Sequence, residues 1–326
     1  MKVLVVTNMF PVPARPAFGI FIKEQAESLR RQGVEVDVLF IEGYRSKLNY
    51  IKAVWELRRR ICQNNYDLVH AHYGLSGWVA RMQCGLPVAV TFHGDDLLGT
   101  PVLTMTQPPR VKYTLSSRVV AGLNKILARL VDAVIVQSAQ MRYVSGNPKS
   151  MVIPCGIDFN LFQLIDKPAA CRQLGLDARK KYILFAADPS VPRKNFPLAQ
   201  QVFDIVKKYY PEVELLAVFN NPYEKIPLYM NACDILIFTS IVEGAGVVIK
   251  EAMACNLPVV SVDVGDVKEV ISGADNCYLT TRNPEEMSQK VLGILNNGKR
   301  SNGRDRVEQF ELSNIAARII SFYHKL

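Results

Sequence analysis

Two glutamates bracket a glycine-bearing segment in the second half of the chain. Glu243 begins the run Glu-Gly-Ala-Gly-Val-Val-Ile-Lys-Glu, and Glu251 ends it eight positions later. Apolar residues at i, i+4 and i+7 predict a short helix around the second glutamate: Val248, Ala252 and Cys255. A glycine loop that enters a helix offers backbone N–H groups to an anion, whereas neighbouring carboxylates are suited to hydroxyl groups. The pattern therefore indicates a site that binds sugar hydroxyls beside a phosphate.

This segment resembles the Glu-x7-Glu signature of the retaining family-4 glycosyltransferases, which have the two-domain GT-B fold. Further marks of the resemblance are DLVHAHYG (67–74), TFHGDD (91–96), IPCGID (153–158), RKN (193–195), and VGD (264–266) with Glu269. Their order and spacing extend the resemblance over nearly the whole chain. The branch that it resembles most includes teichuronic-acid and other surface-polysaccharide enzymes.

The resemblance assigns roles to residues of the second half. It implies that Glu251 bonds the ribose hydroxyls of a nucleotide, that Glu243 lies against the transferred sugar, and that Lys194 binds the diphosphate. A fixed cation lowers the barrier because charge grows on the leaving group as the glycosidic bond breaks. The backbone between the glutamates is expected to approach the donor at Gly244, Gly246, Val247 and Val248.

Some positions depart from the family pattern. The family has an arginine six residues before the lysine, and Asp188 takes that place here, with Arg193 as the candidate replacement. A Pro-Asn pair expected inside the glutamate segment is missing, which leaves the identity of the sugar open. Gly19 stands alone in the loop after the first strand, where the family often has two glycines near the donor phosphate, so a contact is expected at Gly19. That loop lacks G-x-G-x-x-G, which argues against NAD or FAD.

Two histidines follow predicted strands of the first half. The family's histidine at the place of His93 contacts the donor sugar, so His93 is expected to be catalytic. A structural role is the alternative for His93 and equally for His72. Asp95 and Asp96 are expected to anchor a loop or to contact the acceptor, since the resemblance implies neither a metal nor a cofactor.

Short apolar runs alternate with helical patterns along the chain, which predicts an α/β protein with parallel sheets covered on both faces. In the first half the predicted strands are Val3–Thr7, Val34–Phe40, Leu68–Ala71, Val88–Phe92, Ala133–Gln137 and Met151–Pro154. In the second half they are Ile183–Ala187, Glu214–Phe219, Ile235–Thr239, Val259–Val262 and Tyr278–Thr280. Thr100–Val111 is rich in Pro and Thr and is expected to be a loop.

The two runs of strands predict two doubly wound, Rossmann-like domains that face each other across a cleft. Residues 1–155 would form an N-terminal domain on the acceptor side, and residues 156–313 a nucleotide-sugar-binding domain. Residues 314–326 would form a helix that crosses back to the first domain, as the resemblance implies. Ligands of such sheets bind at the carboxyl ends of the strands, so the active site is expected in the cleft.

The composition is that of a globular protein, with 49% apolar residues among 326. No run reaches the ~18 apolar residues that a membrane span needs. The seven cysteines are an odd number and form no CxxC pair, which favours the reduced thiols of a cytosolic protein.

The net charge of +9 belongs to the first half, because residues 1–150 contain 19 Lys+Arg against 10 Asp+Glu. Such asymmetry indicates an anionic partner, with a membrane surface or a charged acceptor favoured over nucleic acid. In Ser117–Val131, one helical stripe is basic, and Val119, Leu123, Ile126 and Leu130 form an apolar stripe. The segment is either an amphipathic helix that lies on an anionic bilayer or a helix with its apolar stripe in the core.

These observations predict a retaining, metal-independent glycosyltransferase of the hexosyltransferase type. Its donor would be a nucleotide-diphosphate sugar, with UDP favoured by family frequency, and its acceptor a glycan or lipid-linked sugar of surface polysaccharide synthesis. The expected location is the cytoplasm, peripherally on the inner face of the cell membrane. The alternatives are a GT-B sugar-nucleotide epimerase and a non-catalytic, donor-binding subunit of a polysaccharide assembly complex.

Overall fold

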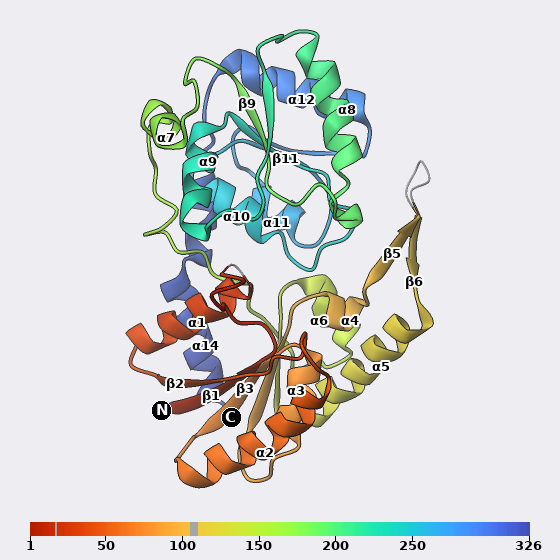
Figure 1. Ribbon diagram of the computed structural model, residues 1–326, viewed down its shortest axis with the longest axis vertical. Helices are drawn as coiled ribbons and strands as arrows, with labels where there is room; N and C mark the ends of the chain where they lie inside the picture. Colours follow the sequence, from red (N-terminus) through yellow and green to blue (C-terminus); the bar gives the residue numbers. More distant parts are fainter. Residues whose placement is uncertain (17, 105–109) are drawn as a thin grey trace. The chain divides into compact units, whose positions relative to one another are not determined.

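The computed structural model describes residues 1–16, 18–104 and 110–326. Its contacts divide the chain into two compact units (Figure 1). The first unit contains Met1–Val102, Val111–Gly156 and Leu312–Leu326, and the second is built on Ile157–Glu311. The chain therefore crosses between the units at 156/157 and again at 311/312. The predicted boundaries, 155/156 and 313/314, lie beside these crossing points.

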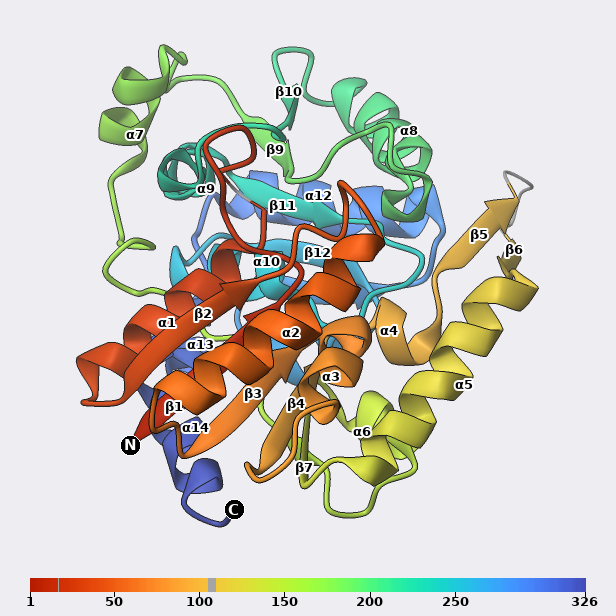
Figure 2. The ribbon, with the colours of Figure 1, turned by 60° about the horizontal axis from the view of Figure 1, so that its bottom comes forward.

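The first unit is built on a parallel sheet with the strand order β2-β1-β3-β4-β7-β8. Its strands are β1 (Lys2–Thr7), β2 (Glu35–Phe40), β3 (Leu68–His72), β4 (Val88–Phe92), β7 (Ala133–Val136) and β8 (Met151–Val152). Its helices are α1 (Ile20–Arg31), α2 (Leu48–Gln63), α3 (Gly74–Arg81), α4 (Asp95–Leu98), α5 (Leu115–Leu130), α6 (Ala139–Ser145) and α14 (Leu312–Tyr323). Figure 2 shows α2 and α3 side by side on the sheet, whereas α1 packs against α14. Helices on both faces bury every residue of the inner strands β3, β4 and β7, whereas the outer strands β2 and β8 are partly exposed.

The second unit repeats this design with the parallel strand order β10-β9-β11-β12-β13. Its strands are β9 (Tyr182–Phe185), β10 (Glu214–Ala217), β11 (Ile235–Phe238), β12 (Val259–Val262) and β13 (Cys277–Thr280). Its α-helices are α7 (Lys167–Leu174), α8 (Phe196–Lys207), α9 (Ile226–Ala232), α10 (Val247–Ala254), α11 (Val267–Ile271), α12 (Pro284–Asn297) and α13 (Gly303–Val307). Its 3-10 turns are η1 (Pro192–Lys194), η2 (Tyr223–Lys225) and η3 (Glu308–Phe310). Alternate residues of β11 enter two separate apolar clusters, so each face of the sheet has its own core.

The eleven strands predicted from the sequence are all present, with ends shifted by at most two residues. The prediction that Thr100–Val111 is a loop is wrong in its described part. Pro101–Thr104 (β5) and Arg110–Tyr113 (β6) pair with each other as a small separate sheet, and residues 105–109 lie outside the described residues. Proline is compatible with this pairing because it stands at the first position of a strand.

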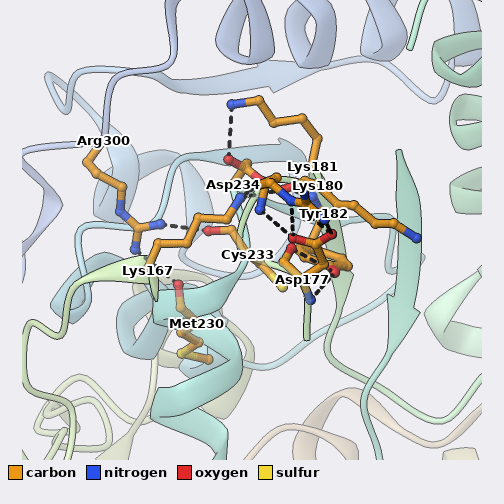
Figure 3. Close-up of polar contacts among 10 residues, drawn as sticks. Lys167, Asp177, Lys180, Lys181, Tyr182, Met230, Cys233, Asp234 and Arg300 are labelled. Atoms are coloured by element: carbon orange, nitrogen blue, oxygen red, sulfur yellow. Dashed lines mark hydrogen bonds and ion pairs between the residues drawn. The ribbon is translucent and has the colours of Figure 1, made fainter. Parts of the chain in front are cut away.

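A charged cluster fixes the starts of β9 and β11 (Figure 3). The Asp234 carboxylate accepts the backbone N–H of Tyr182 at 2.8 Å and the Lys167 ammonium at 2.7 Å. Arg300 donates to the carbonyls of Cys233, Met230 and Cys255. The bonds to Tyr182 and Cys233 satisfy backbone groups at the amino ends of the two strands, and those to Met230 and Cys255 tie in the carboxyl ends of α9 and α10. They hold in register the strands whose opposite ends carry the candidate site.

Helix α14 packs on the first unit through polar contacts as well as apolar ones. Ser28 of α1 and Gln32, which directly follows α1, donate to the backbone carbonyls of Leu312 and Ser313, at 3.0 and 2.6 Å. The Tyr323 hydroxyl lies 2.5 Å from Nδ1 of His70, on the central strand β3. The last helix is thereby tied to the middle of the first sheet.

Candidate active site

The strand order of the second unit identifies the edge where a ligand is expected. In the order β10-β9-β11-β12-β13, the chain reverses its direction of winding between β9 and β11. Doubly wound sheets bind ligands beyond the carboxyl ends of the strands at this switch point. The loop after β9 carries Arg193 and Lys194, and the loop after β11 carries Glu243.

The structure brings these three predicted residues into direct contact. Oε1 of Glu243 accepts from Nζ of Lys194 at 2.5 Å and from Nη1 of Arg193 at 3.0 Å. The side chain of Glu243 is 11% exposed and that of Lys194 is 19% exposed. One carboxylate with two cations leaves a net positive charge, which suits an incoming diphosphate. That Arg193 replaces the family's arginine remains a prediction.

The backbone of the lysine loop is fixed as firmly as its side chains. Asn195 has the left-handed φ of 53° and begins α8. Oγ1 of Thr239, which follows β11, donates to the carbonyls of Lys194 and Asn195 at 2.8 and 3.1 Å. Asp188 accepts from the backbone N–H and hydroxyl of Ser190, so it stabilises a turn in the same loop. The loops after β9 and β11 are thus held together by backbone contacts near the candidate site.

A buried ion pair supports the glycine segment from behind. Asp266 accepts the backbone N–H of Gly246 at 2.7 Å and also bonds the ammonium of Lys250, which is fully buried. Gly265 has φ 61°, and a Cβ there would lie 3.3 Å from the carbonyl oxygen of Glu243. Gly265 and Asp266 therefore shape the loop behind the glycine segment. Ile249 and Lys250 donate to the carbonyl of Gly246, so the first two amides of α10, those of Val247 and Val248, are the ones suited to an anion.

Glu251 lies on α10 as predicted, and it is buried. Its Oε1 accepts the hydroxyl of Tyr223, from η2, at 2.7 Å. Burial raises the pKa of Glu251 to about 7, against a smaller lowering by the tyrosine. Hydroxyl donors from a ribose would stabilise the ionised carboxylate further, which fits the predicted role.

This pKa has a measurable effect on stability. Between about pH 4.5 and 7 the folded protein keeps a proton on Glu251 that the unfolded chain has lost, so the free energy of unfolding should fall as pH rises through this window. Glu251→Gln should remove up to about 3 kcal/mol of this dependence. Urea denaturation of both proteins at pH 5 and pH 8 measures the difference. Equal pH dependence in the two proteins would contradict the assignment.

The first unit has its own cluster at the carboxyl ends of β3 and β4. Nδ1 of His72 lies 3.0 Å from Nε2 of His93. The ring of His93 also packs against Tyr73 and Phe21, at 4.5 and 5.1 Å between centroids. Desolvation lowers the pKa of His93 to about 3 and that of His72 well below its usual value, so both rings are neutral near pH 7. A neutral His93 held by His72 offers a sugar a fixed hydrogen-bonding edge.

Asp96 anchors the turn that carries His93. Its carboxylate oxygens accept the backbone N–H groups of His93 and Gly94 at 3.0 to 3.2 Å. Burial raises the pKa of Asp96 to about 6. The loop-anchoring role that the sequence analysis considered for Asp96 therefore accounts for its position.

Gly19 also lies in the first unit, where it starts α1 with φ 70°. A Cβ at Gly19 would lie 2.5 Å from the carbonyl carbon of Met9. The glycine is thus required for the loop after β1 to fold back on itself. Its predicted contact with a donor phosphate remains a prediction.

Gly19→Ala should destabilise the protein through this backbone clash. Gly33 provides the matched control, because its φ is 85° but nothing lies within 4 Å of a Cβ there. Gly33→Ala should lower the free energy of unfolding only by the strain of a left-handed alanine, about 1–2 kcal/mol. Gly19→Ala should lower it clearly more, because the backbone clash adds to this strain. Chemical denaturation of both variants measures the two costs, and equal values would contradict the close approach.

Sequence reasoning missed three supporting residues of the second unit: Tyr223, Lys250 and Arg282. Arg282, after β13, donates to the carbonyls of Ser240 and Ile241 at 3.2 and 3.1 Å. The signal for Lys250 was present, since a lysine inside an apolar helix needs a buried partner. Tyr223 and Arg282 had no signal, because their contacts join segments that are far apart in the sequence.

Comparisons with known proteins match both units of the chain to glycosyltransferases. The family model "Glycosyltransferase Family 4" matches residues 3–161, and "Glycosyl transferases group 1" matches residues 197–309. The glycosyltransferase MJ1178 of Methanocaldococcus jannaschii is 24% identical over 298 residues, which cover 86% of this chain and 81% of the relative. TuaC of Bacillus subtilis, named for teichuronic acid biosynthesis, is 21% identical and aligns with 89% of this chain and 88% of its own.

Solved structures show the same fold. Anabaena HepE, crystallised with UDP, superposes with a TM-score of 0.72 at 19% sequence identity, over 100% of both chains.

Both matched family models describe glycosyltransferases, and they cover most of the first unit and most of the second. In the part of the chain that the structure describes, no helix is long and apolar enough to span a bilayer.

Proposed function

Because this chain belongs to the family-4 glycosyltransferases, which have the GT-B fold, we propose that it transfers a sugar from a nucleotide-diphosphate donor with retention of configuration. The donor is UDP-linked, in line with the UDP complex of HepE. The acceptor is a glycan or lipid-linked sugar of surface polysaccharide synthesis, in line with the name of TuaC. The enzyme needs no metal and works peripherally at the cytoplasmic face of the membrane.

The observation that carries this proposal is the contact of Glu243 with Lys194 and Arg193 at the β9/β11 switch point. In the proposed complex, Lys194 and the first amides of α10 bind the diphosphate, and Glu251 bonds the ribose. Glu243 then faces the sugar. The cation and the amides thus meet the anionic diphosphate, and the two carboxylates meet rings that carry hydroxyl groups.

The proposed reaction breaks the bond between the anomeric carbon and the terminal phosphate oxygen. The acceptor hydroxyl forms its new bond on the same face of the sugar, and its proton passes to the departing phosphate oxygen. Lys194 stabilises the negative charge that develops on the diphosphate. His93 and Gly19 of the first unit contribute the contacts expected from the family resemblance.

The two alternatives are not favoured by the comparisons, because both matching family models describe glycosyltransferases. An epimerase would turn over the nucleotide sugar without an acceptor, whereas the proposed transferase requires one. A binding subunit would support polymer synthesis in cells even when Glu243 is replaced. Turnover that depends on acceptor and on Glu243 therefore separates the proposal from both.

The first test measures the shift in melting temperature with UDP, GDP, ADP and NAD⁺, on the wild type and on Glu251→Ala. A shift with UDP that the variant loses would support the donor site and its base. A shift with GDP or ADP alone would assign a different base to the donor and would leave the assignment of the donor site unchanged. No shift with any nucleotide would contradict the donor site.

A further inference from the structure

Helix α5 presents an apolar stripe to solvent. Five side chains at i, i+4, i+8, i+11 and i+15 are between 47% and 78% exposed: Leu115, Val119, Leu123, Ile126 and Leu130. The buried residues of α5 lie on its other side: Ala121, Asn124, Leu127 and Ala128. The alternative that the apolar stripe lies in the core is therefore wrong. The side of α5 that faces the core carries Leu127 and smaller residues instead.

Cations border the stripe along the same helix. Arg118, Lys125 and Arg129 recur at i, i+7 and i+11, and all three are exposed. The sequence contains no acidic residue between Asp96 and Asp132, although it has five basic ones there. The outer face of α5 thus combines apolar side chains with an uncompensated positive charge.

We propose that this outer face of α5 docks on an anionic lipid bilayer. A helix that lies in a bilayer interface buries an apolar stripe and places cations beside anionic headgroups. A second copy of the chain fits this face less well, because the +9 charge of residues 1–150 would meet the same charge. The surface is defined by Leu115, Val119, Leu123, Ile126 and Leu130 with their flanking cations, and is called the α5 face.

The α5 face is linked to the candidate site of the first unit through the inner side of the helix. Nδ2 of Asn124 donates to the backbone carbonyl of Asp96 at 2.9 Å, and Asp96 holds the turn of His93. Docking would therefore bring the His93 turn within one helix thickness of the bilayer. This inference rests on the proposed function, since a bilayer surface is where a lipid-linked acceptor is found.

The test is co-sedimentation with vesicles of phosphatidylglycerol and phosphatidylcholine, compared with phosphatidylcholine alone, at low and high salt. The wild type should bind the anionic vesicles at low salt and release them at high salt. Leu123→Glu with Ile126→Glu should abolish binding. Lys125→Ser should weaken it about 5-fold, the effect of one cation near an anionic surface.

Ile51→Glu is the matched control, because Ile51 on α2 is also exposed (61%) but lies outside the α5 face. This variant should bind like the wild type. Binding unchanged by the double substitution, or none by the wild type, would overturn the proposal. So would a dimer in solution that the double substitution dissociates. The UDP-induced shift in melting temperature should be the same in all of these variants and in the wild type. If UDP causes no shift in the wild type, that result counts against the proposed function and not against the α5 face.

Discussion

Glu243→Gln should lower kcat about 10²–10³-fold while the affinity for UDP stays the same or rises. The amide keeps the shape of the side chain but removes the charge that we propose faces the sugar, an electrostatic loss of the size seen at other preorganised sites. Lys194 and Arg193 lose an anionic partner at 2.5 and 3.0 Å, so both become more available to the diphosphate. Steady-state kinetics and calorimetric titration with UDP measure the two effects.

The control for this experiment removes a carboxylate from the same region. Asp188 accepts hydrogen bonds from the backbone N–H and the hydroxyl of Ser190 within the loop after β9. Asp188→Asn should leave kcat within a few fold of the wild type. If Glu243→Gln also leaves kcat unchanged, or if it weakens UDP binding, the carboxylate acts only as a structural partner of the cations.

The sequence was sufficient to predict the fold because hydrophobic periodicity is a local property. Runs such as Ala133–Val136 and Ile235–Phe238 are apolar at every position, which is typical of strands buried on both faces. The alternation of such runs with helices then predicts the parallel sheets. Thr100–Val111 misled the prediction because its Pro and Thr content does not show whether two short segments pair.

The candidate site was predictable where a motif specifies it and unpredictable where loops meet. Lys194 and Glu243 were each assigned to the donor, but their mutual bond joins residues 49 positions apart and required the structure. The same holds for Tyr223 on Glu251. The orientation of α5 could not be predicted for another reason. Both of its faces are apolar, so periodicity alone does not show which face is buried.

Lys194→Ala should give the other large loss, with a different signature from Glu243→Gln. Removal of the ammonium should weaken UDP binding about 10–100-fold, as expected for a charge-assisted bond, and lower kcat/KM about 10²–10³-fold. Stability should change little, because Glu243 keeps Arg193 as its partner. Lys194→Arg retains the charge and should recover part of the UDP affinity. UDP affinity unchanged in Lys194→Ala would contradict the diphosphate role.

The double variant Lys194→Ala with Glu243→Gln separates the two roles that the 2.5 Å contact combines. If Glu243 acts only by holding Lys194, the double variant should be no slower than Lys194→Ala, since nothing is left to hold. If Glu243 acts on the sugar by itself, the double variant should be slower by nearly the full factor of Glu243→Gln. Residues in direct contact are commonly coupled by about 0.5–3 kcal/mol. Even in the second case, therefore, the added loss of rate should be somewhat smaller than the full factor of Glu243→Gln. Because the proposed mechanism gives each residue its own part of the donor, we expect the second result.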